Sequence, residues 1–151
     1  MSTKTVRQAI ISCLTTRVVG TGLYVNNLTG TNSVLGGKYL RPPSVTPFAC
    51  VWTAQVDEVD GVPLTSNEQN ATFMILAFPK VVNPTDPAAR QNAAEDMLDD
   101  IRRALRADPR LGGTVILHSA SGAPWEDEVD QTPKNPALAK CLVSVTAKWR
   151  E

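Results

Sequence analysis

The feature that most constrains the fold is one helix whose two ends are both marked in the sequence. Asp86 is a good N-cap, and Pro87 suits the first helical position. At the other end, Pro109 disfavours the helical conformation at Asp108 and removes a backbone donor, so the helix stops there. Between these ends, apolar residues recur with the helical period of about 3.6: Ala89, Ala93, Met97, Ile101 and Ala104. The pattern predicts a helix over residues 87–107 with one apolar face to bury.

The charged residues of this helix are also ordered along it. Four acids come first and four arginines follow: Glu95, Asp96, Asp99 and Asp100, then Arg102, Arg103, Arg106 and Arg110. Asp96 and Asp100 have a spacing that can hold a metal or an acid/base pair. The helix dipole, however, favours acids in the first half and bases in the last. We therefore expect a solvated charged face and no metal site.

Two glycines, Gly112 and Gly113, follow this helix. A phosphate-binding loop places its glycines before a helix, where the backbone N–H groups and the dipole face the anion. Here the glycines lie between the helix and the apolar segment 114–117, so they serve to reverse the chain. The sequence predicts a turn from helix to strand.

Other segments have the patterns of a first helix and of strands. Residues 3–17 have helical spacing, and residues 49–57 and 139–149 alternate with a period of two. Residues 71–79 are apolar on both faces, as in a central strand. With a short strand at 114–117, the order predicts an α+β fold: a mixed or antiparallel sheet of about four to five strands with helices packed against it.

Two long polar segments, residues 20–47 and 118–136, interrupt what we expect to be a single domain over residues 1–151. Long irregular segments in a compact domain are usually functional or disordered, and we expect removal of residues 26–37 to leave a folded subunit. Trp125 either packs on its own core or anchors an interface. Apolar residues in such segments are candidate interface residues: Leu23, Tyr24, Tyr39, Leu40 and Trp125.

Charge and composition argue against several classes of function. Lys+Arg and Asp+Glu are 15 each, so the formal net charge is zero, whereas a protein that holds nucleic acid non-specifically usually has a basic excess. No apolar run approaches a membrane-spanning length, and the N-terminus lacks a secretory signal pattern. We therefore expect synthesis in the cytosol, no membrane partner, and reduced, buried thiols at Cys13, Cys50 and Cys141.

Residues that could carry catalysis or bind metal are sparse. His118 is the only histidine; it adjoins Ser119, but adjacent residues of an extended chain point apart, and no nucleophile elbow is present. The cysteines lack the spacing of a zinc module, and the acidic run at 125–130 lacks the ligand spacing of an EF-hand. The sequence predicts no enzyme, no cofactor and no metal.

The stretch AAEDMLDDIRRALRADPRLGGTVIL (residues 93–117), followed by a polar segment and LAKCLVSVTAKW (residues 138–149), resembles the tail-terminator and neck proteins of long-tailed bacteriophages. In that family, a helix rich in the pattern L..DI..AL..DP.LGG precedes a strand, and the last strand alternates toward the C-terminus. The resemblance is closest in the C-terminal part of the chain.

This resemblance implies a structural virion protein that forms a homo-hexameric ring. Such a ring caps the tail tube, ends tail polymerisation and joins the tail to the head. The implied partners are other copies of the chain, the tail tube protein, and head-completion or connector proteins. DNA can pass through such a ring without sequence-specific binding. The implied location is the tail or neck of the virion, after assembly in the host cytoplasm.

Two other hypotheses stay open. One is a head-closure or connector ring component of the same neck. The other is a small cytosolic binding module that holds its ligand with residues 20–47.

Overall fold

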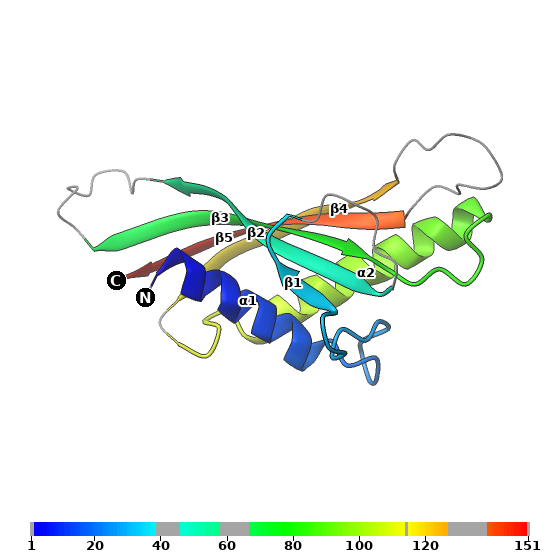
Figure 1. Ribbon diagram of the computed structural model, residues 1–151, viewed down its shortest axis with the longest axis horizontal. Helices are drawn as coiled ribbons and strands as arrows, with labels where there is room; N and C mark the ends of the chain where they lie inside the picture. Colours follow the sequence, from blue (N-terminus) through cyan, green and yellow to red (C-terminus); the bar gives the residue numbers. More distant parts are fainter. Residues whose placement is uncertain (1, 39–45, 58–66, 114, 127–138, 151) are drawn as a thin grey trace.

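The computed structural model of the chain describes residues 2–38, 46–57, 67–113, 115–126 and 139–150. Figure 1 shows its elements in the order α1 (Thr3–Arg17), β1 (Val34–Gly36), β2 (Phe48–Asp57), β3 (Glu68–Phe78), α2 (Pro87–Ala107), β4 (Ile116–Glu126) and β5 (Ala139–Arg150). The strands form one sheet in the order β1-β2-β3-β5-β4. β1 runs parallel to β2, and the other neighbouring pairs are antiparallel. The predicted α+β fold, with a mixed sheet and packed helices, is confirmed.

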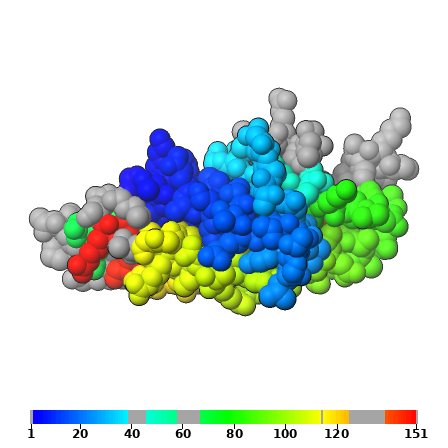
Figure 2. All heavy atoms as spheres, turned by 90° about the horizontal axis from the view of Figure 1, so that it is seen from below, coloured from blue at the N-terminus to red at the C-terminus, as the bar shows by residue number. Residues whose placement is uncertain are grey.

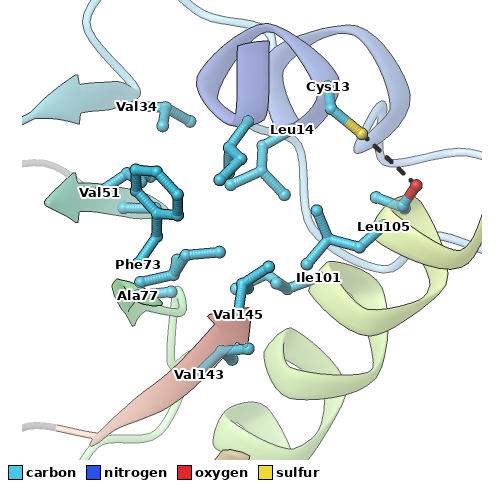
Figure 3. Close-up of a cluster of buried hydrophobic side chains, with 14 of the residues drawn as sticks. Cys13, Leu14, Val34, Val51, Phe73, Ala77, Ile101, Leu105, Val143 and Val145 are labelled. Carbon is cyan, nitrogen blue, oxygen red and sulfur yellow. Dashed lines mark hydrogen bonds between the residues drawn. The ribbon is translucent and has the colours of Figure 1, made fainter. Parts of the chain in front are cut away.

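The main core lies between the two helices and one face of the sheet (Figure 3). Alternate residues of the neighbouring strands β3 and β5 form the sheet side of this core; Phe73 is in register with Val145, and Ile75 with Val143. Fully burying an aliphatic or aromatic side chain of this size stabilises a fold by about 1.5–3 kcal/mol. The helices contribute buried residues at helical spacing: Val6, Ile10, Leu14, Met97, Ile101 and Leu105.

Both ends of α2 lie where the sequence predicts them. The Asp86 carboxylate accepts a hydrogen bond from the backbone N–H of Ala88 at 3.0 Å, and the helix ends at Ala107. After Pro109, Gly112 adopts a φ of 72°, which glycine reaches without strain. Its N–H donates to the Asp108 carboxylate at 2.9 Å. The predicted helix and the predicted turn after it are therefore confirmed.

The opposite face of the sheet carries a second, smaller apolar cluster. Phe48, Cys50 and Phe78 are buried in it, and Leu35, Trp52 and Leu76 pack against them. Beside this cluster, a shallow groove of about 570 Å³ runs over β3, β5 and β4. The sheet is thus apolar on both faces at this end, which accounts for the apolar composition of β3 on both sides.

The structure corrects the extent of the two segments predicted as loops. β4 runs over Ile116–Glu126 instead of 114–117, so Trp125 lies on a strand, in register with Lys140. β4 is an edge strand, and its serine, glycine and proline residues hid its period. Within the other segment, residues 34–36 form β1 and residues 18–33 form an ordered loop. The remainder of the predicted loop 118–136, residues 127–136, lies outside the described residues.

Candidate interaction site

The loop at residues 18–33, which we call the anchored loop, joins α1 to β1 and has its own backbone structure. The N–H of Leu28 donates to the carbonyl of Val18 at 2.8 Å, and both side chains are buried in the main core. Gly20 has a φ of 75°, and a Cβ there would lie 3.0 Å from the Cβ of Asn27. In the space-filling view, the blue atoms of this part of the chain lie against the yellow-green atoms of α2 (Figure 2). The anchored loop is therefore packed onto the helical side of the protein.

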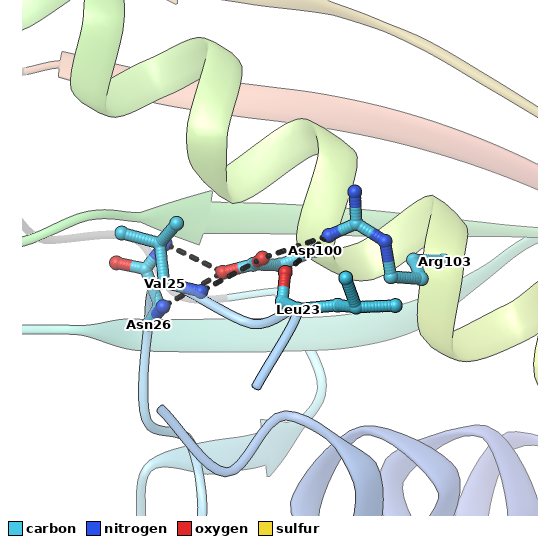
Figure 4. Close-up of polar contacts among 5 residues, drawn as sticks. All are labelled: Leu23, Val25, Asn26, Asp100 and Arg103. Atoms are coloured by element: carbon cyan, nitrogen blue, oxygen red, sulfur yellow. Dashed lines mark hydrogen bonds and ion pairs between the residues drawn. The ribbon is translucent and has the colours of Figure 1, made fainter. Parts of the chain in front are cut away.

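A buried carboxylate on α2 holds the tip of this loop. Asp100 is 0% exposed. Its Oδ1 accepts the N–H of Val25 at 3.1 Å, and its Oδ2 accepts the N–H of Asn26 at 2.7 Å and Nδ2 of Asn26 at 2.9 Å (Figure 4). An ionised carboxylate is costly to bury unless hydrogen bonds and a counter-charge replace its water. The loop backbone supplies most of those bonds, so the carboxylate and the loop stabilise each other.

Arg103, one turn after Asp100 on α2, adds a second attachment. Its Nη1 lies 3.6 Å from Oδ1 of Asp100 and donates to the carbonyl of Leu23 at 2.5 Å. Its guanidinium also lies 5.9 Å from the centre of the Tyr24 ring, a distance at which cation–π attraction operates. Tyr24 is half-buried against the main core. Backbone, ring and side-chain contacts thus fix four consecutive residues of the loop, 23–26.

Within residues 23–26, the side chains that point away from α2 are apolar. Leu23 is 74% exposed and Val25 is 65% exposed, while the residues after each of them, Tyr24 and Asn26, turn toward α2. A single exposed apolar residue is ordinary on a protein surface. Two of them on a loop tied down by a buried charge form a small, preorganised apolar surface. Loops held by a rigid scaffold are the usual carriers of recognition.

The predicted interface residues do not all come together. Leu23 and Tyr24 lie side by side in the anchored loop, with Leu23 outward and Tyr24 inward. The backbone of Trp125 belongs to β4, and Tyr39 and Leu40 lie outside the described residues. Val25 was missed, although it has the same apolar character as Leu23 two residues earlier.

The prediction that all four acids of α2 face solvent is wrong for Asp100. Its position contained the signal, because it follows Met97 by three residues and precedes Ala104 by four. Residues at these spacings share one face of a helix, so Asp100 lies within the apolar stripe. Asp96, by contrast, is exposed. Desolvation raises the pKa of Asp96, and the neighbouring charges of Asp100, Asp99 and Glu95 raise it further.

The three cysteines are free and buried, and their predicted burial is confirmed. Burial raises the pKa of Cys13 to about 11 and that of Cys141 to about 12. The Sγ of Cys13 donates to the carbonyl of Ala104 at 3.5 Å (Figure 3). Since the thiolate is the nucleophilic form of cysteine, Cys13 and Cys141 are unreactive thiols near neutral pH.

The described part of the chain contains no group of three or more His, Cys, Asp or Glu residues that could hold a metal ion. His118 lies on β4 with its side chain exposed. Among the same described residues, no helix has both the length and the apolar character needed to cross a membrane.

Comparison of the chain with models of protein families and with the sequences of curated proteins gives no match. A functional assignment therefore rests on the geometry of the protein and on its sequence pattern. They define an α+β protein with a preorganised apolar loop on its helical side.

Proposed function

We propose that this chain is a structural protein of a bacteriophage neck: a tail-terminator subunit that forms a homo-hexameric ring on the tail tube, ends tail polymerisation and provides the joint to the head. In this proposal, the anchored loop is one of the contacts of the ring, made to a neighbouring subunit or to the tail tube protein. The sequence resemblance is the reason to propose a ring, and the anchored loop is the surface that we propose for one of its contacts.

The observation that carries the proposal is the exposure of Leu23 and Val25 on a loop held by the fully buried Asp100. Binding through a slack loop costs the entropy of ordering it, whereas a loop already fixed in the free subunit avoids most of that cost. A connection with no binding role needs neither a buried carboxylate beneath it nor apolar side chains on top. Leu23 and Val25 are both more than half exposed, which favours a protein–protein contact over a small-molecule site, because small ligands are held in clefts that bury most of their surface.

The topology also offers the second surface that a ring needs. Rings larger than dimers are built from head-to-tail contacts, so each subunit must present two different surfaces. The anchored loop leads directly into β1 at one edge of the sheet, and β4 forms the opposite edge with 11 residues. Exposed edges of this length readily pair with another chain. Two non-equivalent surfaces at opposite edges are consistent with a closed ring.

Size-exclusion chromatography with light scattering tests the proposal. The wild-type protein is expected to have the mass of a hexamer, and the double variant Leu23→Asp/Val25→Asp is expected to be a monomer or to lose binding to tail tubes, with an unchanged Tm. Val82→Asp is the matched control, because Val82 is 93% exposed and lies outside the loop. A wild-type protein that stays monomeric at all concentrations and does not bind tail tubes would overturn the proposed function.

A further inference from the structure

A separate cleft of about 270 Å³ lies between the C-terminal half of α2 and the first half of β4. Arg102 and Arg106 line it from the helix, and His118 and Ser119 line it from the strand; the rest of the lining is apolar. This cleft shares no lining residue with the anchored loop.

Helix and strand geometry bring these four side chains together. Arg102 and Arg106 are four residues apart and therefore lie one turn apart on the same face of α2. Opposite them, the β4–β5 register shifts between Leu117 and Ser119, which leaves His118 unpaired at an irregularity of the strand. Such bulges change the direction of side chains and are common at functional positions. The N–H of Leu117 donates to the carbonyl of Pro109 at 2.9 Å, which fixes the strand against the end of the helix.

The cleft has an excess of hydrogen-bond donors. No acidic side chain lines it, and the Nε of Arg102 is buried without a hydrogen-bond partner in the described part of the protein. Buried polar groups almost always have a partner. The planar guanidinium matches an oxyanion with two parallel N–H bonds, and two guanidiniums over an apolar floor favour a single oxyanion group.

We propose that this cleft binds one oxyanion group, either free phosphate or a carboxylate, with Arg102 and Arg106 as its principal donors and His118 and Ser119 at its rim. Since Nε of Arg102 is buried, the terminal Nη groups of the guanidinium make the bonds to this ligand. The small size of the cleft and the zero net charge of the chain favour an isolated anion over a nucleic-acid backbone, which is held by extended basic surfaces. The inference is independent of ring formation.

NMR titration of the ¹⁵N-labelled protein tests this inference, with inorganic phosphate in one series and glutarate, a dicarboxylate, in the other, both at constant ionic strength set with sodium chloride. We expect saturable shifts of the Arg102 Nε–H signal and of the His118 and Ser119 amides in at least one series. The series with the tighter binding identifies the source of the oxyanion. Shifts that do not saturate in either series, or that sodium chloride reproduces, would overturn the inference.

Variants distinguish binding at a specific site from non-specific attraction of the anion to positive charge. Arg102→Gln is expected to weaken binding at least tenfold, and Arg102→Lys, which keeps the charge but loses the planar fork, is expected to weaken it as well. Arg110→Gln is the control, because this exposed arginine follows the cleft residue Pro109 but does not line the cleft. Equal weakening by Arg110→Gln, or full binding by a folded Arg102→Gln protein, would contradict the assignment.

Discussion

The anchored loop (residues 18–33) and the strand β4 (Ile116–Glu126) have similar compositions but satisfy their backbones in different ways. Both lie in segments rich in small and polar residues, and the sequence predicts most of each as a loop, residues 20–33 and residues 118–126. β4 exchanges its backbone hydrogen bonds with β5 along its length. At the tip of the anchored loop, the N–H groups of Val25 and Asn26 donate to a single side chain, Asp100, instead of to a neighbouring strand. Polar composition therefore does not distinguish a strand from an anchored loop; the partner of the backbone does.

The largest expected effect comes from removing the partner of the loop. Asp100→Ala removes the charged acceptor of the bonds from the Val25 N–H, the Asn26 N–H and the Asn26 side chain. A hydrogen bond to a charged group contributes about 1.5–3 kcal/mol, and we expect a combined loss of about 3–5 kcal/mol in the free energy of unfolding, because the freed loop regains part of its bonds from water. Chemical denaturation measures this loss. Asp99→Ala is the control on the exposed side of the same helix. A loss below about 1 kcal/mol for Asp100→Ala would mean that the carboxylate does not hold the loop.

A smaller effect is expected from disturbing β4 at its closest approach to β5. A Cβ at Gly122 would lie 2.4 Å from the carbonyl oxygen of Leu142 and 3.0 Å from the Cα of Val143. Gly122→Ala must therefore shift the edge strand, and we expect it to cost about 1–3 kcal/mol. The matched control is Gly37→Ala, where no atom lies within 4 Å of the added Cβ, although its φ of 102° adds local strain. An unchanged Tm for Gly122→Ala would show that β4 is not packed as described.

The smallest effect is expected at Asp96, which lies one turn before Asp100 on α2 but is exposed. The pKa of Asp96 is raised in the folded protein, so its ionised form is disfavoured there. A raised folded pKa contributes stability at low pH that disappears as the pH rises through it. Asp96→Asn should therefore raise the Tm slightly at pH 7. At a pH below the pKa of Asp96, where the carboxyl group is already neutral, the substitution should leave the Tm unchanged. The change in free energy should stay below about 1 kcal/mol, far less than the loss of about 2–5 kcal/mol expected for the buried Ile101→Ala.

Much of the fold was predictable because several elements carry local signals. The caps and stripe of residues 87–107 define α2, and the periods of residues 49–57 and 139–149 locate β2 and β5 to within one residue. β1 and most of β4 carry no such period, since each is an edge strand with one neighbour. Their positions depend on long-range pairing, which a local pattern does not contain.

The candidate site was predictable only in part. Leu23 and Tyr24 are recognisable as apolar residues in a polar segment, but their attachment needs Asp100, which is more than 70 residues away in the chain. The expected tolerance to deletion of residues 26–37 also conflicts with the structure. This range contains the buried Leu28 and all of β1, so we expect its removal to destabilise the main core.

The central claim is that the anchored loop is already fixed in the free subunit by the Asp100 carboxylate. Amide hydrogen exchange followed by NMR tests this claim most directly, because it reports on the two N–H groups that donate to Asp100. In the isolated wild-type protein, the amides of Val25 and Asn26 should exchange much more slowly than those of an unstructured peptide. In Asp100→Ala they should lose this protection while the β3 and β5 amides keep theirs. Exchange of Val25 and Asn26 at unprotected rates in the wild-type protein would contradict the claim.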